Sequence, residues 1–207
     1  MNEVINLRKG ETINLRKQQA AVSRFLIGMS WETSKYTGQE DFDLDLSAPQ
    51  LDSNGHVLRP DAVRYICGYL SAQTPDGSLT YSGDERSGKT DNCEDKYEET
   101  LTFEPAKAED RCHKIPVVVT IDEWQDRKQT FGMVTNAFVE ICNADTGEIL
   151  YHYDLSEDFS VQTGVNVLEF SRSRSNPNDW LVKPVGEGFD KGLDGFLVMW
   201  GLAATRQ

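Results

Sequence analysis

The 207-residue sequence has few residues of the kinds that build zinc sites and common catalytic centres. It contains four cysteines and three histidines, without a Cys-x-x-Cys pair or a Cys/His cluster of zinc-site spacing. His-Glu-x-x-His and Gly-x-Ser-x-Gly are also missing, and the spacing indicates no nucleophile–base pair. Cys67 and Cys142 lie in apolar runs, which is typical of reduced core cysteines. The sequence therefore predicts no enzyme active site.

Long apolar segments are missing as well. No apolar run is long enough to cross a bilayer, and the N-terminus lacks the basic and apolar regions of a signal peptide. We therefore expect a cytoplasmic protein without direct membrane insertion. A hydrophobic content of 38% in 207 residues suffices for one sizeable core, so residues 1–207 are predicted to form a single domain.

Positive charge is scarce. Acidic residues number 34 against 21 basic ones, which gives a formal net charge of −13. A field of this sign disfavours nucleic acid and anionic membranes as partners and favours cations. Plain solubility is the alternative explanation.

The acid is concentrated in a segment that alternates strictly between apolar and acidic residues, Gly38–Ala48. As a strand, it places Phe42, Leu44 and Leu46 on one face and Asp41, Asp43 and Asp45 on the other. Aspartate is a poor strand former, and three carboxylates two residues apart repel one another unless a cation lies among them. Oxygen ligands suit calcium first and magnesium second. The spacing also fits the start of an EF-hand loop, but Leu46 occupies the position of that loop's glycine.

A second acidic segment lies between residues 82 and 99. It holds seven acidic and three basic residues, and long loops in compact domains are usually functional or disordered. Asp122 and Glu123 add two more carboxylates at the end of an apolar strand, 115–124, which we expect to be central in its sheet.

Short alternating segments separated by turn signals predict an antiparallel β-sandwich. The repeated pentads 5–9 and 13–17 around Gly10 predict a hairpin. Helical turns are expected only at 131–136 and 188–193. The further expected strands are 23–31, 41–51, 64–70, 100–103, 115–124, 137–143, 149–155, 165–173, 180–185 and 196–200.

Residues Gly83–Thr90 match the phosphate-binding P-loop pattern, and the strand ending at Asp122 resembles the one that holds magnesium in such proteins. The context argues against a nucleotide hydrolase. Asp84 and Glu85 would place carboxylates beside the phosphates, and the residues after Thr90 have almost no apolar face for the required helix. Parallel strands alternating with long helices are not indicated either.

The chain resembles the TerD family of tellurium-resistance and stress proteins. Its most specific segments are DFDLDLSA, within 38–48, and YDLSED at 153–158, and the likeness covers nearly the whole length. The other matching segments are 7–10, 81–84, 131–138, 186–189 and 192–193.

The resemblance implies a sandwich of two sheets with acidic calcium-binding loops at one end, and no enzyme activity. Asp84 matches an aspartate of the family's loop, and Glu85 replaces an asparagine. The family's later acidic cluster falls on Glu98 and Glu99, with Asp95 as the alternative. The candidate metal ligands are Asp41, Asp43, Asp45, Asp84, Glu85, Asp95, Glu98, Glu99, Asp122 and Glu123.

Three hypotheses follow for the function. The first is a calcium-binding sensor or scaffold in the response to tellurite or envelope stress, with other stress-response proteins or a membrane protein as candidate partners. The second is a nucleotide hydrolase that uses Gly83–Thr90. The third is a metal-free interaction module whose acidic residues only form a solvated surface.

Overall fold

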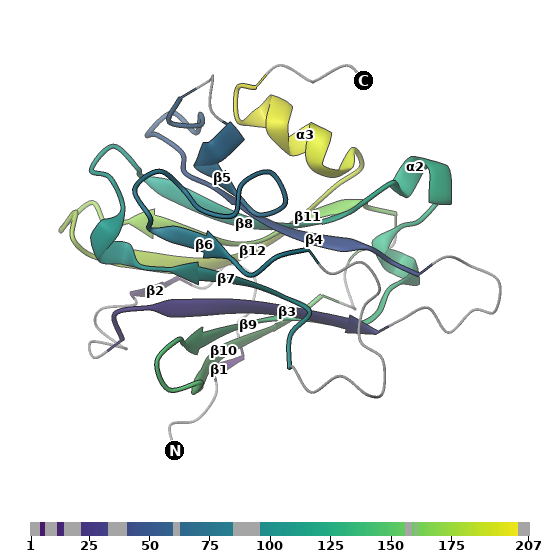
Figure 1. Ribbon diagram of the computed structural model, residues 1–207, viewed down its shortest axis with the longest axis horizontal. Helices are drawn as coiled ribbons and strands as arrows, with labels where there is room; N and C mark the ends of the chain where they lie inside the picture. The colour runs from purple at the N-terminus through teal and green to yellow at the C-terminus, as the bar shows by residue number, and fades with distance from the viewer. Residues whose placement is uncertain are drawn as a thin grey trace.

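The computed structural model describes residues 5–6, 12–14, 22–32, 41–59, 63–84, 96–155, 159 and 161–202. Two six-stranded sheets face each other and enclose the main core, which confirms the predicted β-sandwich (Figure 1). Neighbouring strands are antiparallel among the described pairs, except that β1 runs parallel to β10. The first sheet has the order β1 (Ile5–Asn6), β10 (Ile149–Asp154), β9 (Thr135–Asn143), β3 (Phe25–Glu32), β7 (Glu99–Phe103) and β6 (Leu79–Tyr81). The second has the order β2 (Ile13–Asn14), β12 (Trp180–Phe189), β11 (Gly164–Arg172), β8 (Lys114–Ile121), β4 (Leu44–Pro49) and β5 (Ile66–Cys67).

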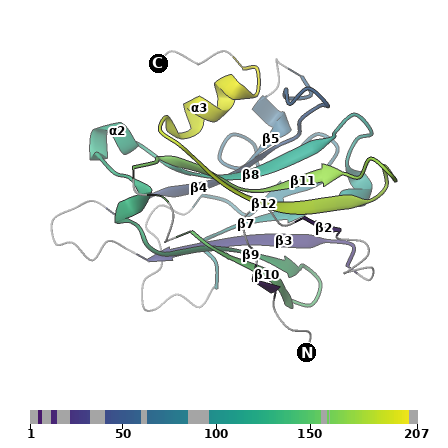
Figure 2. The same cartoon turned by 180° about the vertical axis from the view of Figure 1, so that it is seen from behind.

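Among the described residues, helical structure consists of short pieces between the strands and one longer helix near the C-terminus. That helix, α3 (Gly192–Met199), covers the outer face of the second sheet, as both views show (Figures 1 and 2). The shorter pieces are α2 (Trp124–Arg127), η1 (Val63–Tyr65), η2 (Pro105–Lys107) and η3 (Phe131–Met133). No described helix is long and apolar enough to span a membrane.

β8 is central in the second sheet, as predicted, with β11 on one side and β4 on the other. Val117, Val119 and Ile121 point into the main core. Val118 points the opposite way and packs in a second cluster with Phe196 and Trp200 of the α3 region. The strand is therefore apolar on both faces because both faces are covered.

The predicted N-terminal hairpin is wrong. β1 pairs with Tyr151 and His152 of β10, whereas β2 pairs with Leu181 and Val182 of β12. The two pentads thus contribute edge strands to different sheets. The repeat misled the prediction because an alternating pentad fits any open sheet edge, and both sheets offer one.

The strand predicted at 196–200 is also wrong, because these residues belong to α3 and its end. Gly192 adopts φ 52°, which reverses the chain after β12, and its N–H donates to Thr163 Oγ1 at 2.9 Å. Short apolar runs do not distinguish a buried helix from a strand. The expected helical turn at 131–136 is present as η3, and the strand expected at 64–70 is reduced to η1 and β5.

The described cysteines are free and buried: Cys67, Cys112 and Cys142. Burial raises the pKa of the Cys67 and Cys112 thiols to about 12. Both thiols are therefore protonated and unreactive at neutral pH.

The carboxylate of Asp76 links three segments of the chain by hydrogen bonds. The Asp76 carboxylate accepts hydrogen bonds from Ser78 N–H (2.9 Å), Thr74 Oγ1 (2.8 Å), Gln50 Nε2 (2.6 Å) and Glu109 N–H (3.0 Å). Burial raises the pKa of Asp76, but these hydrogen bonds outweigh it and hold the pKa below its ordinary value.

We therefore expect Asp76→Asn to lower the free energy of unfolding by about 2 kcal/mol at pH 7, because the amide leaves buried donors poorly paired. A carboxyl whose pKa is depressed by folding stabilises the protein above its unfolded pKa of about 3.9, and this contribution is lost as the pH falls through the folded value. The difference between wild type and variant should therefore shrink in urea titrations below about pH 3.5. Asp110→Asn, at an exposed position, is the control. An Asp76→Asn variant that is destabilised by the same amount at pH 7 and below about pH 3.5 would contradict this account.

Candidate functional site

The acidic strand alternates as predicted, but its acids are not all solvated. Leu44 and Leu46 are fully buried in the main core. On the opposite face Asp43 is only 5% exposed and Asp45 only 8%, whereas Asp41 is exposed. Burial of two carboxylates on one short strand is costly unless each gains partners or a cation.

Two hydrogen bonds fix the start of this strand. Trp31 Nε1 donates to the Phe42 carbonyl at 3.0 Å, and Asp122 N–H donates to the Asp43 carbonyl at 2.9 Å. Because Leu44 pairs with Ile121 and Asp45 with Thr120, the register sets Asp43 opposite Asp122. Acids far apart in the sequence thereby meet across two neighbouring strands.

A third acid comes from the other sheet. Glu99 is fully buried in β7, and its Oε2 accepts the Leu46 N–H at 2.7 Å. β5 pairs only with Ala48 and Pro49, so the edge of β4 beside Leu46 is open to this side chain. Glu99 Oε1 accepts a short hydrogen bond from the Tyr81 hydroxyl. Burial, this hydrogen bond and the charges of Glu99, Asp45 and Asp84 raise the pKa of Tyr81, so the phenol remains a donor.

Asp45, Asp84 and Glu99 form the three-carboxylate group. One carboxylate oxygen from each lies within 4.8 Å of the other two. Asp84 follows β6, where Ser82 N–H donates to the Thr100 carbonyl at 3.0 Å and Thr100 N–H donates to Ser82 Oγ at 2.9 Å. The group therefore draws on β4, on β7 and on the segment after β6.

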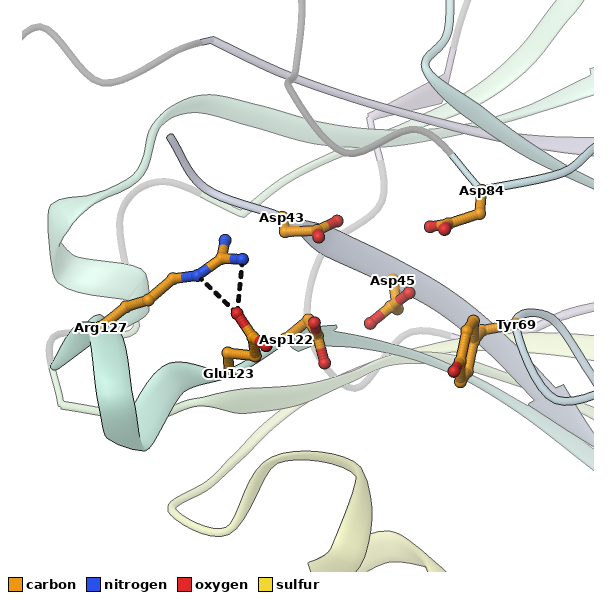
Figure 3. A pocket seen from close by; sticks show the side chains of 7 residues that line it. All are labelled: Asp43, Asp45, Tyr69, Asp84, Asp122, Glu123 and Arg127. Carbon is orange, nitrogen blue, oxygen red and sulfur yellow. Dashed lines mark hydrogen bonds and ion pairs between the residues drawn. The ribbon is translucent and has the colours of Figure 1, made fainter. Parts of the chain in front are cut away.

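A cleft of about 400 Å³ opens above this group. Asp45 and Asp84 of the three-carboxylate group line this cleft (Figure 3). Glu99, the third member, is fully buried and is not among the lining residues. Five carboxylates and one guanidinium line the cleft, which leaves an excess of four negative charges among the lining residues. Its lining residues are Asp43, Asp45, Tyr69, Asp84, Asp122, Glu123 and Arg127.

Arg127 is a cation built into the cleft. Its Nη2 lies 2.7 Å from Glu123 Oε2, and its Nη1 donates to the Asp41 carbonyl at 3.3 Å (Figure 3). Glu123 and Lys128, on either side of α2, adopt left-handed conformations with φ 46° and 53°. Such conformations are unfavourable for residues with side chains, and here they bracket the single turn that returns Arg127 to Glu123.

The structure brings six of the sequence-predicted ligands together: Asp43, Asp45, Asp84, Glu99, Asp122 and Glu123. Asp41 is exposed and takes part through its carbonyl, which also accepts Gln129 Nε2 at 3.4 Å. Glu98 is half-buried and bonds through its N–H to the Met29 carbonyl at 3.0 Å. Glu85 and Asp95 lie outside the described residues. That any of these acids bind metal stays a prediction.

Sequence reasoning missed Arg127, Tyr69 and Tyr81. The four-residue spacing of Glu123 and Arg127 is that of a helical ion pair, and it would have indicated the contact had 124–127 been expected to be helical. The two tyrosines carry no such signal, because strand and turn tyrosines are common in any sandwich.

The donor set fits a hard divalent cation. Calcium takes six to eight oxygens at about 2.3–2.6 Å, so two of its ligands are up to about 5 Å apart. The three-carboxylate group meets this condition with its separations of at most 4.8 Å. Its ligand atoms are all oxygens, without the nitrogen or sulfur that zinc or copper favours.

Known proteins are similar to this chain over nearly its whole length. The TerD domain pattern matches residues 4–200. The chain belongs to the TerD domain family. General stress protein 16U of Bacillus subtilis (strain 168) is 35% identical over 198 residues, which cover 96% of this TerD chain and 97% of that protein. Tellurium resistance protein TerD of Serratia marcescens is 34% identical over 201 residues, which cover 97% of this chain and 99% of that protein.

Solved structures share the TerD fold. A crystal structure of a telluride resistance protein (TerD) homologue from Streptomyces coelicolor A3(2) superposes with a TM-score of 0.63 at 22% identity, covering 83% of this chain and 92% of that one. The crystal structure of a protein of unknown function superposes with a TM-score of 0.67 at 23% sequence identity, covering 90% of this chain and 99% of that one. The strands around β8 are not arranged as in a P-loop domain. β8 is antiparallel to both of its neighbours, whereas a P-loop domain has parallel strands at this place. Of the motif itself, Gly83 and Asp84 are described and the rest lies outside the described residues.

Trp31 anchors the acidic strand of this TerD domain, so its replacement should destabilise the fold. We expect Trp31→Phe to lower the free energy of unfolding by about 2–4 kcal/mol, because the Phe42 carbonyl loses its donor and a fully buried ring leaves a cavity. Urea unfolding followed by circular dichroism measures the effect. Trp124→Phe, at a half-buried position, is the control and should cost clearly less. Equal losses for the two variants would show that Trp31 has no special role.

Proposed function

We propose that this TerD protein is a calcium-binding sensor or scaffold of a stress response, without catalytic activity. The observation that carries the proposal is the three-carboxylate group of Asp45, Asp84 and Glu99, whose oxygens lie within 4.8 Å of one another. A bound calcium ion supplies positive charge at the point where buried carboxylates repel. The protein supplies oxygen ligands from three separate segments.

Cation binding at this group has a mechanical consequence. Glu99 belongs to the first sheet and Asp45 to the second, and Asp84 is the exposed member that follows β6. The three residues gain a common attachment when they share an ion. The ion then joins Asp84 to β4 of one sheet and β7 of the other, which provides a calcium-dependent surface for a partner protein.

Relatives support the stress-response part of the proposal. Their names describe a general stress protein and a tellurium resistance protein, and the similarity extends over nearly the full length of each chain. Candidate partners are other stress-response proteins or a membrane protein. Since the main core contains residues of both sheets, we also propose that residues 1–207 form one domain.

Calcium should stabilise the protein by mass action, because the unfolded chain does not hold the three carboxylates together. Free calcium at one hundred times the dissociation constant adds about 2.7 kcal/mol, and each kcal/mol raises Tm by roughly 2–4 °C at this chain length. For a micromolar site, calcium at about 0.1 mM, which is one hundred times the dissociation constant, should therefore raise Tm by about 5–10 °C. Magnesium should have a smaller effect, because it demands a small octahedral site and releases water reluctantly. Differential scanning fluorimetry of metal-stripped protein measures both shifts.

Asp84→Asn and Asp45→Asn should each reduce the calcium shift by half or more. Asp84 is exposed, so its substitution tests the site with little risk to folding. Asp110→Asn removes the same charge at an exposed position outside the cleft and should keep the full shift. Equal shifts with calcium and magnesium, unchanged in Asp84→Asn and abolished by salt, would instead favour the metal-free acidic module.

The same preparation tests the hydrolase alternative. Titration with ATP and magnesium in a calorimeter should release no binding heat, because β8, which ends just before Asp122, is antiparallel to both of its neighbours, whereas a P-loop domain has parallel strands there. ATP binding that disappears in Lys89→Ala would reverse the order of these two hypotheses.

A further inference from the structure

Another buried carboxylate, Glu140, is not among the residues that line the cleft and lies on the outer face of the first sheet. Glu140 is 6% exposed in β9, where its neighbours Val139 and Ile141 point the other way into the main core. Its Oε2 accepts hydrogen bonds from Lys96 Nζ and the Tyr97 hydroxyl, both at 2.5 Å. Its Oε1 lies 3.1 Å from His152 Nδ1. Burial raises the pKa of Glu140, but these partners outweigh it and hold the pKa below its ordinary value.

Lys96 and Tyr97 lie near the end of the acidic segment 82–99, three and two residues before Glu99. The Tyr97 ring covers Gly28 of β3 so closely that a Cβ there would lie 2.4 Å from the ring carbon Cγ. Gly28 pairs with Glu140 on one side and with Thr100 on the other. Tyr97 therefore crosses over β3 to reach Glu140 on the far strand.

The chain then passes from the outer face to the interior within two residues. The Glu98 N–H donates to the Met29 carbonyl at 3.0 Å, and Glu99 begins β7 with its side chain fully buried. The contacts of Glu140 thus hold the last described residues before a candidate cation ligand. We call Glu140, Lys96 and Tyr97 the outer latch.

We propose that Glu140 is a positioning residue for the cation site: by holding Lys96 and Tyr97 on the outer face, it fixes the chain that delivers Glu99 to the three-carboxylate group. This inference rests on the proposed function. Without the outer latch, residues 96–98 must be ordered when the cation binds. If the loss of Glu140 frees the equivalent of one of these residues, the entropy of ordering it corresponds to about a tenfold loss of affinity.

The test compares three variants by calcium calorimetry at 20 °C, after circular dichroism shows that each is folded. Glu140→Gln should weaken calcium binding about tenfold. Tyr97→Phe changes no charge and keeps the ring over Gly28, and it should weaken binding about threefold through the lost hydroxyl. Glu169→Gln is the control: it removes the same charge from a half-buried acid of β11 that faces Lys114 at 3.6 Å, and its affinity should stay within twofold of wild type.

A merely structural role would lower Tm of the metal-stripped protein and leave the dissociation constant unchanged, which would overturn the inference. So would equal effects of Glu140→Gln and Glu169→Gln. Hydrogen exchange gives a readout that does not depend on calcium, because the Glu98 amide should exchange at least tenfold faster in Glu140→Gln. Unchanged exchange would overturn the outer latch even where wild type binds calcium. If wild type does not bind calcium but the Glu98 amide exchanges faster in Glu140→Gln, the proposed function is wrong and the outer latch only stabilises the fold.

Discussion

The acidic site depends on one hydrogen bond between the two sheets, from the Leu46 N–H to the carboxylate of Glu99. An open strand edge usually pairs with another strand or is protected by a charge. Here a glutamate from the opposite sheet takes that position, and its second oxygen accepts the Tyr81 hydroxyl. The bond fixes a fully buried charge beside Asp45. The structure thereby holds carboxylates together at an edge where two sheets meet, which is the repulsive arrangement that the proposed cation would relieve.

The protein relieves part of this repulsion itself. Arg127 pairs with Glu123 and contacts the backbone at Asp41, so one wall of the cleft has its own counter-charge. The part around Asp45, Asp84 and Glu99 brings together carboxylates from three segments of the chain. The two halves of the cleft therefore differ in kind: one is an internal ion pair, and the other is a set of oxygens suited to an external ion.

Sequence patterns predicted the strands whose apolar residues follow a simple local rule. The acidic strand followed from its strict alternation, β8 from its near-continuous apolar run, and β9, β10 and β11 from short segments between turn signals. The structure brings six of the predicted ligands together, and their binding of metal stays a prediction. The patterns could not say that Glu99 would cross to Leu46, because that contact depends on the sheets' relative placement. They also could not separate the helix at Phe196 from a strand, since tertiary packing on Val118 decides it. Arg127 was missed because a single helical turn leaves no periodic signal.

The two short N-terminal strands give the chain an unusual dependence on its first residues. β1 closes the edge of one sheet at β10, and β2 closes the edge of the other at β12. Trimming the chain past residue 14 would therefore uncover two backbone edges at once, one in each layer. Uncovered edges are templates for strand exchange between molecules. Proteolysis near the N-terminus would thus promote self-association of an otherwise intact sandwich, and a fusion partner is better attached at the opposite end of the chain.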